Sequence, residues 1–414
     1  MDTARSLLRS LGAIAVVYLA LQALLPKSQI PLLVSVFLAT NMFLRSLVFR
    51  SIINPHTKPV EGVGNRFFKA LPGTRQRELL SALKLLQLYH AAQKSASERR
   101  RKLFKMMTWR QQQLCNDVGY SNKLNKLDQL SKVNQQFLDG VTQFAFDRYD
   151  LSHADLGKGA TDSSVLGLNY RVIETLGHFA RDWLSSEEIR PLIDYIQGQL
   201  ATIIPKHEQA DTCVIVPGLG LGRIAHEIAR LGDYQVHAVE FLGLMHLCHA
   251  YIYLGADAAP IYPYIHTCSN FTSTDAHYRH VDVVPQLPPP NLELDMSDFR
   301  FFELGKPYKN VVVVLAFFID TAENLMDYFD AITKLTAPPA KGFWINIGPL
   351  KYGLSPQVEL NAEEIEQIRH KLGWHYLDYR NDVTDTVGYI TDKQLMWQGY
   401  YGTTRWTLAR QPRR

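Results

Sequence analysis

The sequence predicts an α/β fold: a Rossmann-like, mostly parallel sheet of seven strands, preceded by a helical N-terminal extension and closed by an antiparallel hairpin. Three observations support this prediction. From about residue 212, short apolar runs alternate with amphipathic stretches of helical spacing. Residues 311–315 are apolar at every position, as expected of a strand buried on both faces of a sheet. Glycines end the first apolar run abruptly and a helical pattern follows, which is typical of nucleotide-binding units.

The predicted elements divide the chain into three parts. Residues 67–150, 169–183 and 187–204 show helical spacing, with a Gly-, Ser- and Asp-rich loop at 151–164. The expected strands are 213–216, 236–240, 292–294, 311–317, 343–347, 374–379 and 405–409, and the helices between them 221–231, 244–254, 324–335 and 363–372. We therefore expect an apolar N-terminal segment (1–50), a helical region (51–205) and a cofactor-binding α/β domain (206–414).

The turn after the first predicted strand is the first candidate site. Gly218, Gly220 and Gly222 lack the side chains that would keep a ligand away from the backbone. Glu240 ends the next apolar run and offers two oxygens to a ribose diol. Ligands of open α/β sheets bind beyond the carboxyl ends of the strands, so these residues are expected to share one cleft. An adenosine-bearing cofactor fits the pattern, but such glycines occur in both nicotinamide-dependent and S-adenosylmethionine-dependent enzymes.

Three features favour S-adenosylmethionine over a dinucleotide. The chain shows one unit of this kind, without a second mononucleotide-binding half. Asp298 and Phe299 follow the third strand, where a carboxylate can bind the adenine amino group and an aromatic ring can cover the base. The terminal hairpin is typical of methyltransferase sheets. As alternatives, Asp298 could only cap a turn, and Glu240 could be a surface carboxylate at a strand end.

Several longer segments resemble the carnosine N-methyltransferase family of class I S-adenosylmethionine-dependent enzymes, over roughly residues 120–410. The matching segments are Arg181-Asp-Trp183, Val216-Pro-Gly-Leu-Gly-Leu-Gly-Arg223, Tyr262-Pro-Tyr-Ile-His266 with Ser269-Asn270, Asp298-Phe299, Phe317-Phe-Ile-Asp-Thr-Ala-Glu-Asn324 and Trp344-Ile-Asn-Ile-Gly-Pro-Leu350. Enzymes of this family transfer the sulfonium methyl group to an imidazole nitrogen of β-alanyl-histidine. The resemblance implies that the glycine turn, Glu240, Asp298 and Phe299 bind the cofactor.

The resemblance also implies roles on the substrate side. Asp320 corresponds to the carboxylate that faces the imidazole, where it would fix the tautomer and stabilise the forming cation. Tyr352 and either Tyr400 or Tyr401 fall at aromatic positions assigned to substrate binding. Arg171, from the helical segment before the sheet, is the candidate partner of the cofactor carboxylate. The alternative for Asp320 is capping of the helix that follows it.

The sequence departs from the family pattern at three positions. Gly353 stands where the family has a histidine that contacts substrate, Lys351 replaces the family's leucine, and Glu323 stands where a histidine is usual. These departures concern the substrate side of the site. From the resemblance as a whole, we expect the acceptor to be carnosine or a related histidine-containing dipeptide or peptide. A catalytically inactive binding protein with this fold and a methyltransferase of an unrelated small molecule are the alternatives. A nicotinamide oxidoreductase is suggested by the glycine turn alone.

Composition narrows the partners and the compartment. A net charge of +4 gives no indication of a nucleic-acid partner. The four cysteines are scattered without metal-ligand spacing, so we expect buried free thiols in a reducing compartment and neither a zinc site nor a disulfide. A homodimer is left open.

Two apolar runs near the N-terminus, residues 11–25 and 30–44, predict a membrane hairpin with arginines at both outer ends. Each run is shorter than the ~20 residues of a comfortable transmembrane helix. The alternatives are a cleaved secretory signal and a helical pair buried against the main domain. The expectation is a membrane-associated protein whose catalytic domain faces the cytosol.

Overall fold

A seven-stranded sheet forms the centre of the α/β part, in the order β5-β2-β1-β6-β7-β9-β8. The parallel strands are β1 (Thr212–Pro217), β2 (Gln235–Val239), β5 (Leu292–Asp295), β6 (Asn310–Ala316) and β7 (Lys341–Gly348). The hairpin of β8 (Trp374–Gly388) and β9 (Tyr400–Arg410) adds to β7 in antiparallel orientation. The predicted fold class is therefore confirmed, including the terminal hairpin.

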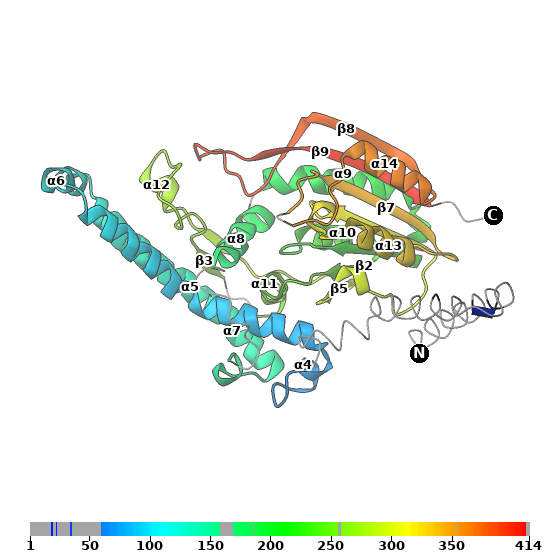
Figure 1. The fold of residues 1–414 in the computed structure, drawn as a ribbon, viewed down its shortest axis with the longest axis horizontal. Helices are drawn as coiled ribbons and strands as arrows, with labels where there is room; N and C mark the ends of the chain where they lie inside the picture. Colours follow the sequence, from blue (N-terminus) through cyan, green and yellow to red (C-terminus); the bar gives the residue numbers. More distant parts are fainter. Residues whose placement is uncertain are drawn as a thin grey trace.

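The structure is a computed structural model. It describes residues 18, 19, 22 and 34 and residues 59–410, but within the latter range not residues 158–168, 185, 256–257 and 354. Figure 1 shows helices on both faces of the sheet and a long helical arm that projects away from it.

Burial on both faces of the sheet explains why residues 213–216 of β1 are all apolar. Val214 and Val216 pack with α9 (Ser186–Ile203) and α10 (Arg223–Leu231) on one face. Cys213 and Ile215 point to the opposite face, where α13 (Leu325–Leu335) and α14 (Ala362–Lys371) cover the sheet. Successive side chains of a strand point to opposite faces, so a strand with helices on both sides has no solvent-exposed row.

The helical region is built around two long helices, α5 (Gly73–Lys105) and α7 (Tyr120–Tyr149), with α6 (Trp109–Asp117) at their far end (Figure 1). The leucines of α5 and the apolar residues of α7 from Phe137 onward form a core shared with α8 (Asn169–Phe179) and α11 (Gly243–Leu254). The remaining helices are α4 (Arg66–Ala70), α12 (Thr274–His277), the π-helix η3 (Ala180–Leu184) and the 3-10 helices η2 (His153–Asp155), η4 (Lys206–Asp211), η5 (Phe299–Phe301) and η6 (Ile319–Thr321).

A second small sheet, β3 (Ala259–Ile261) with β4 (Val281–Val283), was not predicted. Each strand has three residues, which is too short to show an alternating pattern. The buried free thiols Cys213 and Cys248 agree with the prediction from the sequence.

The membrane prediction needs correction. Within the ranges that the structure describes, no helix combines the length and the apolar character needed to cross a bilayer. This finding contradicts the expected transmembrane helix and the membrane-associated localisation; the physical weakness of that prediction was the shortness of both apolar runs. Apart from Tyr18, Leu19, Gln22 and Val34, these runs and the expected hairpin lie outside the described residues.

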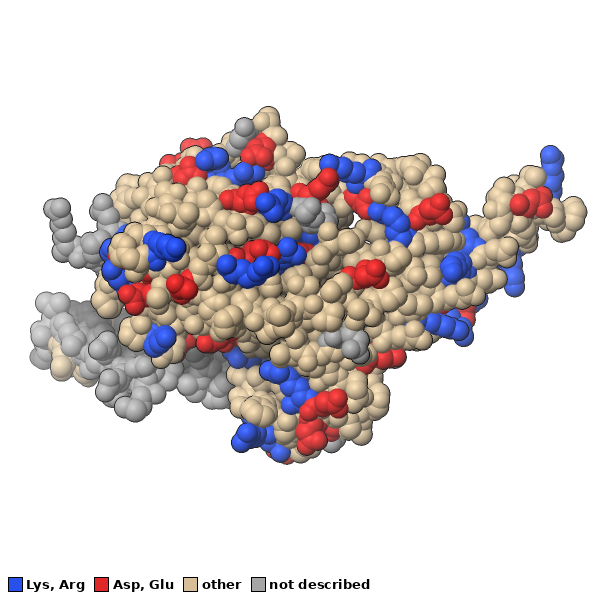
Figure 2. Space-filling view, turned by 180° about the vertical axis from the view of Figure 1, so that it is seen from behind, with Lys and Arg blue, Asp and Glu red and all other residues tan. Residues whose placement is uncertain are grey.

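Charges of both signs are mixed on the face of the molecule seen in Figure 2. On the face shown in Figure 2, lysines and arginines lie interspersed with aspartates and glutamates instead of gathering in one patch. In the basic run of α5, Arg101 pairs with Asp128 at 2.7 Å, and Arg100 donates to the His266 carbonyl oxygen at 2.7 Å. These arginines therefore serve internal contacts of the helical arm.

Candidate active site

The glycine turn after β1 forms one wall of a cavity of about 510 Å³. Gly218, Gly220 and Gly222 have φ angles of 59°, 61° and 84°, a region that other L-residues rarely adopt. A Cβ atom at Gly218 would overlap the Phe318 ring, and one at Gly222 would overlap the His249 imidazole. Gly218 and Gly220 line the cavity, while Gly222 lies behind them at the N-terminus of α10. The turn is therefore bare of side chains because of both its conformation and its packing.

The segment Arg181-Asp-Trp183 clamps this turn from the π-helix η3. Asp182 accepts a hydrogen bond from the Leu221 backbone N–H at 2.9 Å, and the Trp183 indole donates to the Leu221 carbonyl oxygen at 3.0 Å. Two side chains from η3 thus bind both the backbone N–H and the backbone carbonyl of Leu221, in the turn. The matched motif therefore has a local structural explanation.

Glu240 lies directly after β2, buried at the cavity wall. Its carboxylate accepts a hydrogen bond from the Leu242 backbone N–H at 2.8 Å. Burial raises the pKa of Glu240 to about 7, and backbone hydrogen bonds from Leu242, Gly220 and Phe241 limit the rise. The carboxylate is therefore a buried acceptor next to the turn, and the alternative of a surface position is excluded.

Asp298 and Phe299 also line the cavity, beyond β5. Asp298 caps η5 by accepting from the Arg300 backbone N–H at 3.0 Å, and it binds the Arg300 side chain with a shortest contact of 2.6 Å. Phe299 packs edge-on against Phe318, with ring centroids 5.9 Å apart. Asp298 therefore caps a turn, as the alternative interpretation proposed, and it also lines the cavity.

Asp320 lies in η6, on the loop that leaves β6, and is 7% exposed. Its Oδ2 atom accepts a hydrogen bond from the Lys351 backbone N–H at 2.9 Å. Burial raises the pKa of Asp320, while this hydrogen bond and the Lys351 charge act in the opposite direction. The cap of α13 is Asn324, whose side chain accepts from the Met326 backbone N–H. The capping alternative for Asp320 is therefore not realised.

The residue that turns the chain toward Asp320 is Phe317, which has a positive φ of 53°. Its backbone N–H remains bound to the Ile347 carbonyl oxygen at 2.9 Å. A Cβ atom at Gly348 would lie 3.0 Å from the Phe317 backbone, so the two strand ends pack closely. Left-handed conformations of bulky residues are costly and are found mainly at functional sites.

The three candidate tyrosines have different surroundings. Tyr352 donates its hydroxyl to the Leu360 carbonyl oxygen at 2.7 Å, and Tyr400 is 45% exposed. The Tyr401 hydroxyl lies 3.0 Å from the Lys351 Nζ atom, and its ring centroid lies 6.0 Å from that of Phe317. None of the three is among the described residues that line the cavity. Tyr401 thus contacts Lys351, whose backbone N–H binds Asp320.

Arg171 lies away from the cavity lining as described and pairs with Glu78 at 3.5 Å. Arg181 lies closer: its guanidinium stands 4.8 Å from the Tyr389 ring centroid and 3.1 Å from Asp182. It also borders a small space beside Gly218. Its position in the Arg181-Asp-Trp183 motif is the sequence signal for Arg181, and the assignment of Arg171 stays a prediction.

The sequence interpretation also missed Tyr389, which lines the cavity and stacks on Phe317 with centroids 5.2 Å apart. Tyr389 follows β8 at the start of the long connection to β9, where no regular pattern marks it. Further lining residues come from the helical region and from the loop after β6: Glu174, His178, Thr321, Glu323, Asn324 and Tyr328.

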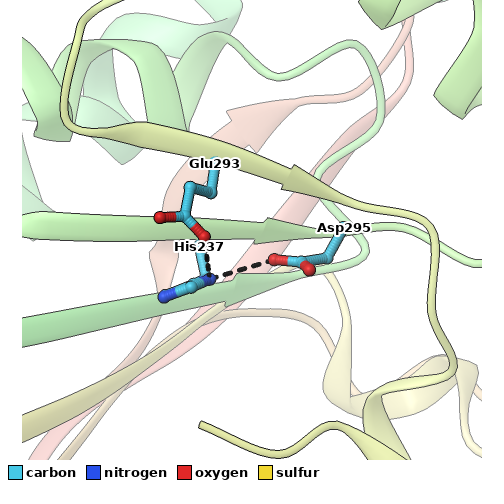
Figure 3. A group of neighbouring side chains, drawn as sticks. All are labelled: His237, Glu293 and Asp295. Carbon is cyan, nitrogen blue, oxygen red and sulfur yellow. Dashed lines mark hydrogen bonds and ion pairs between the residues drawn. The ribbon is translucent and has the colours of Figure 1, made fainter. Parts of the chain in front are cut away.

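One group with metal-ligand side chains was also missed within the described ranges, His237 with Glu293 and Asp295 (Figure 3). The His237 Nδ1 atom lies 3.0 Å from Asp295 and 3.6 Å from Glu293, so both carboxylates converge on one ring nitrogen. A nitrogen between two carboxylates is an N–H donor, and a cation would have to replace its proton.

The backbone of Asp295 also links the edge strand β5 to the site. Its carbonyl oxygen accepts a hydrogen bond from the Glu240 backbone N–H at 2.9 Å.

A model of the family described as carnosine N-methyltransferase matches residues 162–412, more than half of the 414 residues. The chain belongs to the carnosine N-methyltransferase family. The carnosine N-methyltransferase of Schizosaccharomyces pombe is 27% identical over 374 residues, 81% of this chain and 95% of that protein. That of Rattus norvegicus is 30% identical over 243 residues, 55% of this chain and 60% of that protein. An uncharacterised Saccharomyces cerevisiae protein is 28% identical over 324 residues, 69% of this chain and 71% of that protein.

Solved structures with a similar fold are distant methyltransferases. The magnesium protoporphyrin IX methyltransferase of Synechocystis, solved with bound S-adenosylhomocysteine, has 11% identity and a TM-score of 0.32, covering 61% of this chain and 90% of that chain. A glycopeptide N-methyltransferase has 11% identity and a TM-score of 0.33, covering 56% of this chain and 93% of that chain.

Family membership makes this protein an S-adenosylmethionine-dependent methyltransferase, and the cavity fits that cofactor. The bare turn lets a ligand approach the backbone, and the cavity lining adds the carboxylates of Glu240 and Asp298 and the rings of Phe299 and Phe318. Two buried nitrogens beside the turn, Nδ1 of His178 and Nε of Arg181, have no hydrogen-bond partner among the described residues.

Proposed function

We propose that this enzyme transfers the methyl group of S-adenosylmethionine to an imidazole ring nitrogen of carnosine or a related histidine-containing dipeptide or peptide. The observation that supports this function is the buried Asp320 carboxylate, on the loop after β6 whose residues Phe318 and Thr321 line the cavity. The family's reaction supports the same acceptor class.

On the cofactor side, residues of the chain bind and orient S-adenosylmethionine. The backbone at Gly218 and Gly220 leaves room for the ligand, and Glu240 accepts hydrogen bonds from the ribose hydroxyls. Asp298 and Phe299 bind the adenine amino group and ring face. Arg181, in place of Arg171, binds the cofactor carboxylate. Bound S-adenosylmethionine supplies an electrophilic methyl group.

On the acceptor side, neutral imidazole already carries a nucleophilic lone pair, so the enzyme mainly has to align it. Asp320 accepts the N–H of the other ring nitrogen, which fixes the reactive tautomer. As the new N–C bond forms, the ring becomes cationic, and the nearby carboxylate stabilises that charge. The Phe317, Phe318 and Tyr389 rings wall the cavity and limit access of water. The ring N–H proton is afterwards released through Asp320 to solvent.

The test is incubation of the purified full chain with labelled S-adenosylmethionine and a panel of histidyl dipeptides. We expect labelled product with the wild type and a kcat about 100- to 1,000-fold lower in Asp320→Asn, because the negative charge that stabilises the forming cation is lost. The matched control is Asp330→Asn on the exposed side of α13, which should retain activity.

Equal activity of Asp320→Asn and the wild type would contradict the role of Asp320. If S-adenosylhomocysteine binds but no dipeptide yields product, the protein is the alternative, a binding protein with the methyltransferase fold.

A further inference from the structure

Lys351 connects Asp320 with Tyr401. Its backbone N–H donates to Asp320 Oδ2 at 2.9 Å, and its Nζ atom donates to the Tyr401 hydroxyl at 3.0 Å. The ammonium lies 5.5 Å from the Tyr401 ring centroid. One residue therefore places a cationic side chain on the same segment that holds the buried carboxylate.

The ammonium has no carboxylate partner within the described ranges, where no ion pair of 4.0 Å or less includes Lys351. Its hydrogen bond to Tyr401 raises the pKa of Lys351, so the side chain is cationic at neutral pH. The phenol accepts from this ammonium and retains its own O–H as a donor. Two donors, one of them charged, are thus available at one point.

The chain close to Lys351 is not enclosed by other side chains at Gly353. Gly353 lies two residues after Lys351, and a Cβ atom built on it meets no other atom within 4 Å. The Phe317 ring contacts both the Tyr389 ring in the cavity and the Tyr401 ring. An aromatic row therefore leads from the cavity wall to Lys351.

We infer that Lys351 and the Tyr401 hydroxyl form an anion subsite, and that the methyl acceptor carries a carboxylate which binds there while its imidazole faces Asp320. This inference rests on the proposed function. A carboxylate has two oxygens, which match the two donors of the subsite. A small histidyl peptide with a free terminal carboxylate has both groups a few bonds apart, whereas a histidine inside a protein chain has an amide at that point.

The experiment compares two acceptors that differ in one group, carnosine and its decarboxylated analogue β-alanyl-histamine. The full chain is assayed as wild type, Lys351→Met, Lys351→Arg and the surface control Lys371→Met on α14. We expect Lys351→Met to lose kcat/KM for carnosine by about 10- to 100-fold, the usual effect of one charge-assisted hydrogen bond. Turnover of β-alanyl-histamine should stay unchanged, Lys351→Arg should restore most of the loss, and Lys371→Met should behave as wild type.

A second readout is calorimetric binding of both acceptors to the enzyme saturated with S-adenosylhomocysteine. The wild type should bind carnosine more tightly, and Lys351→Met should remove that preference. An equal loss for both acceptors, or no preference in the wild type, would overturn the subsite while leaving the proposed function intact. If the wild type neither binds nor methylates any histidyl acceptor, the proposed function fails and the inference fails with it.

Discussion

At the scale of single residues, two buried carboxylates flank the glycine turn. Glu240 follows β2 and Asp320 follows β6, and both strands pair with β1. A carboxylate removed from water requires hydrogen-bond donors in compensation. Leu242 supplies one backbone N–H to Glu240, and Lys351 supplies one to Asp320. Under the proposed function, the remaining lone pairs accept hydrogen bonds from a ribose at Glu240 and from an imidazole at Asp320.

Glu240 should make cofactor binding pH-dependent. Burial raises its pKa to about 7 from an ordinary value of 4.5, so ionised Glu240 is disfavoured in the cofactor-free fold. Its contribution to the free energy of unfolding of that form therefore falls as the pH rises from about 4.5 to about 7. Ribose hydroxyls donate to the ionised carboxylate, so binding below pH 7 releases a proton. Affinity should increase with pH, by up to about tenfold per unit below the pKa.

The measurement is calorimetry with S-adenosylhomocysteine between about pH 6 and pH 8, in buffers of different ionisation enthalpy that report proton release. Glu240→Gln should bind more weakly and without the pH dependence. A pH-independent wild type would show that Glu240 does not bind the ligand.

At the scale of elements, the turn between β1 and α10 depends on a clamp from η3. Asp182 is 2% exposed and holds both the Leu221 N–H and the Arg181 guanidinium. Trp183 holds the carbonyl of the same residue, Leu221. The conformation of the turn is therefore set by a segment outside the strand–turn–helix unit.

Asp182→Asn should weaken S-adenosylhomocysteine binding by about 10- to 100-fold, since a charge-assisted hydrogen bond to the turn is lost and Arg181 loses its counter-ion. Calorimetry measures the affinity, and thermal unfolding shows whether the fold is retained. The matched control is Asp194→Asn in the exposed Arg190–Asp194 pair of α9, which should change neither quantity. Wild-type affinity in Asp182→Asn would exclude the clamp as a determinant of binding.

Local sequence patterns predicted most elements around the site, but not every residue that lines it. Strands β1, β6 and β7 were predictable because they are buried on both faces, and the turn was predictable because its glycines interrupt an apolar run. Glu240 and Asp298 follow directly from strand ends. Tyr389 depends on where the long β8–β9 connection lies, and this connection pairs with Asn270 and Phe271, far away in the sequence, so no local pattern encodes its position.

At the scale of the whole molecule, the cavity is assembled from both large parts of the chain. The sheet supplies the turn and the strand-end carboxylates, while α8 supplies Glu174 and His178. The helical arm packs on α11 through a continuous apolar core, which fixes α8 over the sheet. The expected boundary at residue 205 stays a prediction about chain organisation, but residues from both sides of it line one site.

The central claim is methyl transfer to an imidazole ring nitrogen, and the position of the methyl group in the product tests it most directly. The full chain is incubated with carnosine and methyl-labelled S-adenosylmethionine, and the product is examined by tandem mass spectrometry and NMR. We predict one labelled methyl group on a ring nitrogen, and none on the β-alanyl amine or the carboxylate. A label at either of those groups, or no labelled product, would contradict the proposed function.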